Sequence, residues 1–260
     1  MTNKKTHISY SELKDWAHCP HYHKKNWIEK VASFEGNEYT AFGTAIHDVC
    51  EKKLLRENID QEQVFQIGFD KQLQKLAEKN IEVNQNNIEQ MRTAGPEILA
   101  EVEDALDDYF GDYEVYSSEE LLYEEIENFG YHFKGFVDAV VKVGDTYHIF
   151  DWKTCSWGWD SRKKAEKMVT YQLTLYKHFF CQKHNLDPKK VETHFALLKR
   201  TAKKDRVEIF RVTSGPKKTE NALKLLYQAI YNIQKGFTIK NKLNCRKPYP
   251  CSLYNTEHCN

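Results

Sequence analysis

Two aspartates and a lysine lie close together in one segment of the chain, residues 133–153. If Gly144 and Asp145 form a two-residue hairpin turn, counting back along both strands places Asp138 opposite Asp151. Directly opposed side chains have Cβ atoms about 4.5–5.5 Å apart, so two carboxylates at these positions repel one another. A divalent cation reverses that cost, because Mg²⁺ prefers carboxylate oxygens. The hairpin therefore predicts a metal site.

Lys153 lies two residues after Asp151 and projects from the same face of the expected strand. Its ammonium group could orient an attacking water and stabilise charge that develops on a phosphate. Two carboxylates, a lysine and a cation are suited to metal-assisted phosphodiester hydrolysis. The alternative is a surface hairpin with an ordinary charge pair, although the apolar flanking residues indicate burial, and buried carboxylates need partners. A one-residue slip in register would separate the groups onto opposite faces.

The elements that must position this hairpin can be predicted from hydrophobic periodicity and turn signals. The pattern Ser9-x-x-Glu12 predicts a capping box and a helix that starts near residue 9. The pair Gly95-Pro96 predicts a break within a polar helical region. This order favours an α/β (α+β) fold, a central mixed sheet flanked by helices. The expected helical segments are 40–56, 60–112, 163–184 and 217–235; the expected strands are 121–127, 133–143, 147–153, 194–199 and 207–212; residues 236–260 form an irregular tail.

The composition is that of a globular protein, with 260 residues, 40% hydrophobic and 29% charged. No apolar run could cross a bilayer, and the basic start at residues 1–5 has no apolar stretch behind it, so a cytoplasmic location is expected. The net charge of zero does not indicate a nucleic-acid binder, but the charge is segregated. Basic groups at 163–167, 199–204 and 235–247, opposed by acidic residues at 101–127, permit a phosphate-binding groove; solvated faces are the alternative.

The chain has seven cysteines, an odd number that argues against complete pairing. In a cytoplasmic protein they should remain reduced. Cys50, Cys155 and Cys181 lie in strongly patterned segments and are expected to be core thiols.

The motifs together resemble those of a known family. Gly135-Phe-Val-Asp138, Asp151-Trp-Lys153 and Gln172-Leu-Thr-Leu-Tyr176 resemble the GxxD, (D/E)xK and QxxxY series of RecB-type nucleases. Upstream, Phe42-Gly-Thr-Ala-Ile-His47 resembles the family's helical G-x-x-x-H segment, and Ser9–Pro20 resembles its S-x-x-x-L…C-P opening. These enzymes belong to the PD-(D/E)XK superfamily, which includes CRISPR-associated spacer-processing nucleases and phage exonucleases. The resemblance covers residues 9 to 176 in the expected order.

The resemblance implies a restriction-endonuclease-like core and a role for each matched residue. Asp138 and Asp151 would bind Mg²⁺ or Mn²⁺, with His47 and the carbonyl of Trp152 as further ligands. Lys153 would be the catalytic lysine. Gln172 and Tyr176 share a helix face and would reach the same cleft. Without the resemblance, His47 would be interpreted as a structural histidine, and Gln172 and Tyr176 as boundary residues of an amphipathic helix.

In some RecB-type nucleases one N-terminal and three C-terminal cysteines hold a [4Fe–4S] cluster. The resemblance implies such a cluster on Cys19, Cys245, Cys251 and Cys259, since four thiolates are the usual ligand set. The tail departs from the family's tight C-x-x-C, because Tyr254 stands three residues after Cys251. Zinc, with His258 or His21 as a further ligand, and unligated cysteines are the alternatives.

The expected function is a metal-dependent deoxyribonuclease in a single nuclease domain over residues 1–260. Its expected parts are a mainly helical 1–115, a catalytic sheet core at 116–215, and a C-terminal helix with the cysteine tail at 216–260. The favoured activity is that of an exonuclease on single-stranded or end-containing DNA, as in DNA repair or recombination. A structure-specific or CRISPR spacer-processing endonuclease is the first alternative. A non-catalytic DNA-binding subunit is the second, disfavoured by the intact Asp138, Asp151 and Lys153.

Overall fold

The computed structural model describes residues 6–31, 34–246 and 250–259. The chain forms two compact units, each described by itself. We call one the sheet unit, made of Glu35–Glu120 and Phe136–Ser214. The other, the terminal unit, is made of Met1–Phe34, Leu121–Gly135 and Gly215–Asn260. Two of the predictions fall partly outside the described residues. One concerns residues 1–5, which were not expected to begin a secretory signal, and the other concerns residue 247 of the third basic group.

The sheet unit is built on four neighbouring strands in the order β3-β4-β5-β6. Strands β3 and β4 are antiparallel, β4 and β5 are parallel, and β5 and β6 are antiparallel, so the sheet is mixed as predicted. The parallel step needs a crossover, which helices α7 and α8 provide. The strands are β3 (Tyr131–Val143, entering from the terminal unit), β4 (Thr146–Cys155), β5 (Val191–Lys199) and β6 (Val207–Arg211); β2 (Glu114–Ile126) pairs with β3.

The β3–β4 hairpin has the predicted register. Val143 pairs with Thr146 across the two-residue turn, and the ladder continues to Ala139 and Phe150. Gly144 has a positive φ of 55°, the backbone conformation that a two-residue turn needs at its first central position.

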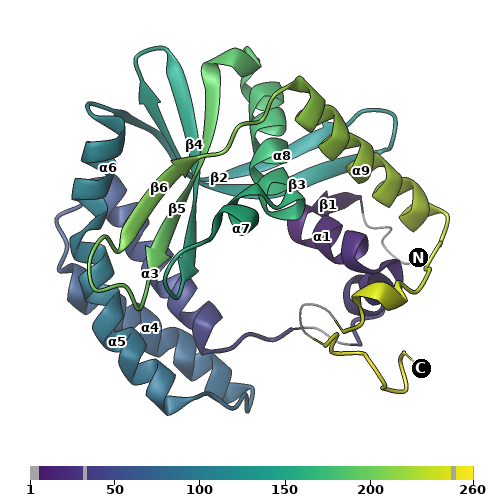
Figure 1. Ribbon diagram of the computed structural model, residues 1–260, viewed down its shortest axis with the longest axis horizontal. Coiled ribbons are helices and arrows are strands. Elements are labelled where there is room, and N and C mark those ends of the chain that lie inside the picture. The colour runs from purple at the N-terminus through teal and green to yellow at the C-terminus, as the bar shows by residue number, and fades with distance from the viewer. Residues whose placement is uncertain (1–5, 32–33, 247–249, 260) are drawn as a thin grey trace. The chain divides into compact units, whose positions relative to one another are not determined.

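Helices cover both faces of this sheet (Figure 1). On one face, α3 to α6 form a continuous core with alternate residues of the strands, including Phe150, Trp152 and Ala196. On the other face, α8 reaches strand β4 through Gln172, which bonds Asp151. The helices are α3 (Glu38–Leu54), α4 (Gln61–Glu78), α5 (Gln85–Ala100), α6 (Val102–Phe110), α7 (Ser161–Ala165) and α8 (Lys167–His184), with a 3-10 turn η2 at Pro188–Lys190.

The break predicted at Gly95-Pro96 is wrong, because helix α5 runs through both residues. Proline leaves the carbonyl four residues earlier without its helical donor. Here that carbonyl, on Arg92, accepts a hydrogen bond of 3.0 Å from Nε2 of Gln66 on α4. Gly95 also permits a close approach of the two helices, since a Cβ on it would lie 2.3 Å from the ring of Phe65. Tertiary contacts therefore replace the missing local bond.

The terminal unit begins with a strand that the sequence analysis did not anticipate. Strand β1 (His7–Ser9) pairs in parallel with β3, His7 opposite His132. Ser9 then caps helix α1, accepting a hydrogen bond of 3.2 Å from the backbone N–H of Glu12. The carboxylate of Glu12 bonds buried His23 instead of closing a capping box. The remaining elements are α1 (Tyr10–His18), α2 (Pro20–His23), the π-helical turn η1 (Lys24–Ile28), α9 (Pro216–Gln234) and η3 (Lys242–Asn244).

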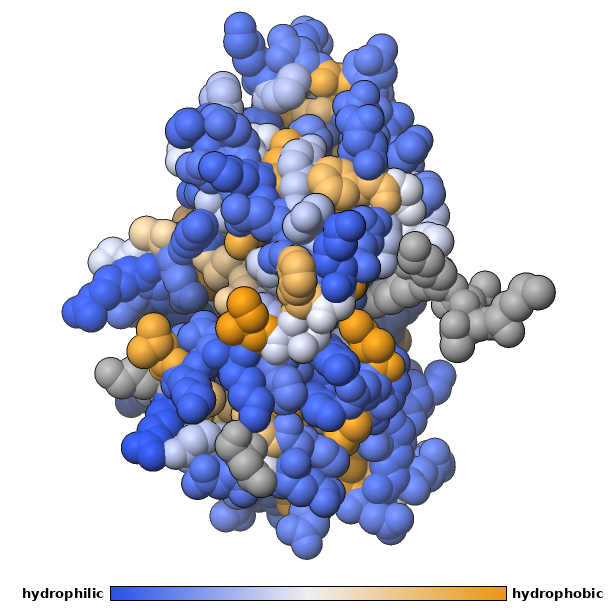
Figure 2. Space-filling view, turned by 90° about the vertical axis from the view of Figure 1, so that its right-hand side faces the viewer, coloured by the Kyte–Doolittle hydropathy of each residue, from blue (hydrophilic) through white to orange (hydrophobic). Residues whose placement is uncertain are grey.

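The surface drawn in Figure 2 is mainly hydrophilic, and its hydrophobic residues form separated patches. In the part of the chain that the structure describes, no helix combines the length and apolar character that crossing a membrane requires.

Candidate functional site

The β3–β4 hairpin brings Asp138 and Asp151 together one step beyond its last paired residues, Ala139 and Phe150. The Asp138 carboxylate crosses to strand β4, where Oδ2 accepts a hydrogen bond of 2.8 Å from the backbone N–H of Trp152. The negative charge of Asp138 contributes to raising the pKa of Asp151. The two acids therefore share one site, as their spacing in the sequence predicted.

Asp151 is the buried member of the pair, with 2% of its surface exposed. Burial raises its pKa to about 6, Lys153 lowers it, and Asp138 raises it further. Oδ1 accepts a hydrogen bond of 2.7 Å from Gln172. Oδ2 forms an ion pair with Lys153 and has no other hydrogen-bond partner among the described residues. Because a carboxylate oxygen offers two lone pairs, Oδ2 can coordinate a cation as well as pair with Lys153.

Asp138 is more accessible, with 24% of its side chain exposed. Burial raises its pKa to about 6, while the charge of Lys153 and the Trp152 N–H lower it. Glu119 and Glu51 raise the pKa further through their negative charges. The site therefore has excess negative charge that a cation would neutralise.

His47 comes to the site from helix α3, whose N-terminus is fixed by a capping box between Asn37 and Thr40. Its Nδ1 lies 3.8 Å from Oδ2 of Asp138. Burial lowers the pKa of His47 to about 4, the Asp151 charge opposes this shift, and Lys153 adds to it. The imidazole is therefore neutral near pH 7 and can offer a lone pair to a metal.

Helix α8 supplies Gln172 and Tyr176 on one face, as the four-residue spacing predicted. The Gln172 amide nitrogen lies 2.7 Å from Oδ1 of Asp151 and 3.2 Å from the Tyr176 hydroxyl. Tyr176 itself is buried. Gln172 thus contacts the carboxylate directly, and Tyr176 reaches it through Gln172.

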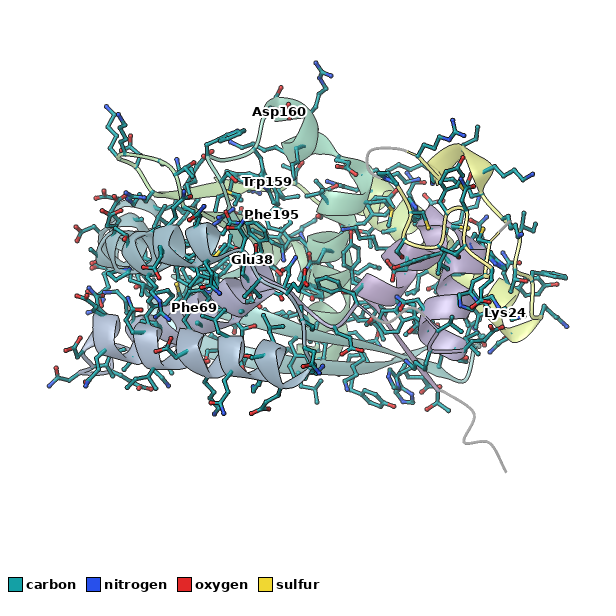
Figure 3. All side chains as sticks on the ribbon, turned by 90° about the horizontal axis from the view of Figure 1, so that it is seen from below. Lys24, Glu38, Phe69, Trp159, Asp160 and Phe195 are labelled. Atoms are coloured by element: carbon teal, nitrogen blue, oxygen red, sulfur yellow. The ribbon has the colours of Figure 1, made fainter. Side chains whose placement is uncertain are left out.

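An aromatic residue that the sequence analysis missed lies under the lysine. Lys153 Nζ lies 5.9 Å from the ring centroid of Phe195 on the neighbouring strand β5. Trp159 packs edge-on against the same ring with the ring centroids 5.1 Å apart, and Figure 3 labels these two side chains next to one another. Asp160 fixes this segment by capping helix α7 through the N–H of Lys163. The parallel pairing of β4 and β5, which places Phe195 here, has no local signal in the sequence.

Glu51 is a second residue near the site that was not predicted from the sequence. It lies four residues after His47 on α3, so the two share a helix face, and this spacing could have indicated it. Its carboxylate accepts a hydrogen bond of 2.7 Å from Ser118 and raises the pKa of Asp138.

In the terminal unit, Cys19, Cys245, Cys251 and Cys259 line one cavity of about 340 Å³. Burial raises the pKa of the Cys251 thiol, and the charges of the other three cysteines raise it further. The chain positions them through backbone contacts, since the N–H of Cys251 bonds the carbonyl of Cys245 at 2.9 Å. His21, the alternative zinc ligand, has its Nε2 2.9 Å from the carbonyl of His258. The structure thus gathers the four predicted cysteines.

All seven cysteines lie among the described residues, and all are free thiols. Cys50 and Cys181 are buried, as expected of core thiols, whereas Cys155 is only half-buried, because it ends strand β4.

A family model described as the PD-(D/E)XK nuclease superfamily matches residues 7–256. Among solved structures, a provisionally named exonuclease from Eubacterium rectale aligns with a TM-score of 0.59 and 16% identity, over 89% of this chain and 82% of that one. The crystal structure of SSO0001 aligns with a TM-score of 0.38 and 13% identity, over 89% of this chain and 78% of that one. No match is found among curated protein sequences.

Proposed function

The chain belongs to the PD-(D/E)XK nuclease superfamily, and from this premise we propose that it hydrolyses DNA phosphodiester bonds with the help of a divalent cation. The observation that carries the proposal is the convergence of Asp138, Asp151 and Lys153 beside the neutral His47. We assign these residues the roles that their chemistry supports.

Mg²⁺ or Mn²⁺ would be held by Asp138, Asp151 and His47, with the backbone carbonyl of Trp152 as a further ligand. The residues fit such an ion, because Oδ2 of Asp151 is buried and has only the Lys153 ammonium as a partner among the residues described, which leaves a lone pair for a cation. The two neighbouring acids are also costly to ionise side by side, and a cation offsets that cost. When bound, the ion supplies Lewis-acid polarisation of a phosphoryl oxygen.

The side chains of the protein supply the remaining functions. Lys153 orients the attacking water and stabilises the negative charge that develops on the phosphate. Phe195, under its ammonium group, limits where that group can lie. Gln172 holds the Asp151 carboxylate in one orientation, and Tyr176 in turn contacts Gln172.

We propose DNA with free ends, single-stranded at the point of cleavage, as the substrate. Trp157, which follows strand β4, is 79% exposed and offers a surface on which a base can stack. The hydroxyl of its neighbour Ser156 accepts a hydrogen bond from Arg200, which belongs to the basic segment 199–204. The Arg200 guanidinium therefore supplies positive charge near Trp157, where it can contact the phosphates of a bound strand. The name of the Eubacterium rectale structure agrees with an exonuclease.

The test is a cleavage assay with 5′- and 3′-labelled single and double strands and closed circular DNA, with Mg²⁺ or Mn²⁺. The parent protein should degrade linear DNA and leave closed circles intact. Asp138→Asn and Lys153→Met should each reduce cleavage by about 10³-fold or more while DNA binding persists. Lys183→Met is the matched control and should remain active, because Lys183 pairs with Glu120, is as exposed as Lys153 and lies outside the three basic groups.

Cleavage of closed circles would replace the exonuclease proposal with an endonuclease, including the spacer-processing kind. DNA binding without cleavage under every metal condition would indicate the non-catalytic subunit.

We further propose that Cys19, Cys245, Cys251 and Cys259 hold a [4Fe–4S] cluster, rather than zinc. Zinc is disfavoured because Nε2 of His21, a further ligand that it could use, already lies 2.9 Å from the carbonyl of His258. The cavity of about 340 Å³ suits a larger group. Iron, sulfide and a visible spectrum of anaerobically purified protein test this; a colourless, iron-free sample contradicts it.

A further inference from the structure

A second group of metal-binding side chains lies in the sheet unit, away from the acidic site. His148 of β4 is paired with Glu192 of β5, and His194 stands two residues further along β5. All three side chains therefore project from the same face of the sheet. Asp151 is an odd number of residues from His148 and projects from the opposite face. The group is thus separate from the carboxylates of the candidate active site.

The donor atoms of this group converge. His148 Nδ1 lies 3.1 Å from Nε2 of His194 and 3.8 Å from a carboxylate oxygen, Oε2, of Glu192. One donor atom from each of the three residues lies within 4.8 Å of the others. A tetrahedral ion at about 2.0–2.1 Å from each ligand separates the ligands by about 3.3–3.4 Å. The two separations from His148 Nδ1, 3.1 Å to His194 and 3.8 Å to Glu192, differ from that value by only a few tenths of an ångström.

The atoms that face away from this point have partners suited to orienting ligands. The Tyr109 hydroxyl of α6 lies 3.2 Å from Nδ1 of His194, so it can accept that N–H while Nε2 keeps its lone pair. Arg211 of β6 bonds the other oxygen of Glu192, Oε1, at 2.7 Å. Such contacts fix the tautomer of a ligating histidine and the orientation of a ligating carboxylate.

The environment keeps both imidazoles neutral, as metal binding requires. Burial lowers the pKa of His194 to about 3, and His148 and Arg211 lower it further. Burial also lowers the pKa of His148, although the charge of Glu192 opposes this.

The surrounding charges are mixed. Arg211 opposes a cation, but 55% of its side chain is exposed to solvent, which screens its charge. Tyr109, the partner of His194, also lines a cavity of about 340 Å³, and the acidic residues around this cavity attract cations. These are Glu101, Asp104, Asp108 and Asp205.

We propose that His148, Glu192 and His194 form a zinc site that fastens strands β4 and β5 and, through Tyr109, helix α6 (Figure 1). Two imidazoles and one carboxylate favour Zn²⁺ over Mg²⁺, which prefers oxygen ligands. The fourth position is taken by water. Because its ligands join two strands on the face opposite Asp151, the ion would stabilise the sheet, and its binding does not depend on nuclease activity.

The test counts zinc by mass spectrometry after equilibrium dialysis of the full chain, first stripped with chelator. His148→Gln and Glu192→Gln should each bind one zinc ion per chain fewer than the parent, while any zinc at the cysteines or the acidic site cancels in the comparison. His184→Gln is the matched control, because His184 pairs with Glu120 at 2.6 Å and stands outside this ligand group. Zinc should raise the melting temperature of the parent more than that of Glu192→Gln.

Crystals of the parent grown with zinc give a measurement that does not depend on variants. Anomalous diffraction should place a zinc ion between His148 and Glu192. An empty position there, or an equal zinc count in parent and both variants, overturns the proposal. A zinc ion lost equally from the His184→Gln control overturns it as well.

Discussion

Two carboxylates at the candidate active site, Asp151 and Asp138, are costly to ionise in the folded protein. Asp151 is 2% exposed, and burial raises its pKa to about 6. Asp138 beside it also has its pKa raised by burial to about 6. Without a cation, the folded protein therefore holds these protons more tightly than the unfolded chain does, and ionising the acids destabilises the fold.

Asp151→Asn should stabilise the metal-free protein at pH 8 by about 1–3 kcal/mol. The parent has its full stability below the unfolded pKa of about 3.9 and loses stability as pH rises through the folded pKa of about 6. The gain should therefore disappear near pH 4. Urea unfolding with chelator from pH 4 to 8 measures this.

Asp145→Asn is the control for this pH dependence, because the Asp145 side chain is 90% exposed in the turn of the same hairpin. Asp145→Asn should change the free energy of unfolding little at any pH. If Asp151→Asn were less stable than the parent at pH 8, the assigned electrostatic cost would be wrong.

Gln172 is expected to act on the metal through Asp151. Gln172→Leu removes the 2.7 Å hydrogen bond to Oδ1 and should raise the Mg²⁺ or Mn²⁺ concentration for half-maximal cleavage by about 10–100-fold. The rate at saturating metal should fall much less. Gln74→Leu, on the exposed surface of α4, should leave the metal dependence unchanged.

A Gln172→Leu protein with normal metal dependence and a much lower rate at saturating metal would show that Gln172 contacts the substrate instead.

At the scale of elements, predictions succeeded where the signal was local. The β3–β4 register follows from a two-residue turn that needs glycine and from strands rich in β-branched residues. Strand β1 was missed because three residues, His7–Ser9, are too few to show a period. Strand β2 starts at Glu114, earlier than expected, because none of residues 114–121 is buried and the segment therefore lacks the apolar alternation of a core strand.

The residues of the candidate site also differ in whether a local sequence pattern indicates their positions. The positions of Asp138, Asp151 and Lys153 follow from the two-residue turn and strand periodicity, both of which are local. His47 and Gln172 come from distant helices. Only the family resemblance indicated those two, because the packing that brings α3 and α8 to the hairpin leaves no local pattern.

Helix α5 offers a test in which a glycine-to-alanine substitution should destabilise the protein instead of stabilising it. A glycine-to-alanine change inside a helix normally stabilises it by up to about 1 kcal/mol. Gly95→Ala should instead destabilise the protein by about 1–3 kcal/mol, because the new Cβ would lie 2.3 Å from the Phe65 ring. Thermal or urea unfolding measures the change.

Gly68→Ala on α4 is the matched control, since its Cβ would meet nothing nearer than Ala45 at 3.7 Å. It should be neutral or stabilising. Equal effects of the two substitutions would mean that the contact between Gly95 and Phe65 does not hold α5 against α4.

At the scale of the whole molecule, the terminal unit contains both ends of the chain, and the sheet unit is inserted between its segments. Cys19 lies near one end, and Cys245, Cys251 and Cys259 lie near the other. A cluster on these residues would therefore close a loop that contains the entire sheet unit. Closing a long loop removes conformational entropy from the unfolded chain and so stabilises the folded one.

Cys251→Ser should accordingly lose the iron and destabilise the terminal unit by about 2–5 kcal/mol, within the range for losing a long-range covalent link. Limited proteolysis should cut first within Gly215–Asn260. The metal concentration for half-maximal cleavage should not change at temperatures where the variant is folded, because Asp138 and Asp151 belong to the sheet unit. Cys155→Ser, at a half-buried cysteine of the sheet unit, should keep the iron and the stability. Equal iron content and melting temperature in Cys251→Ser and the parent would rule out a stabilising cluster on these cysteines.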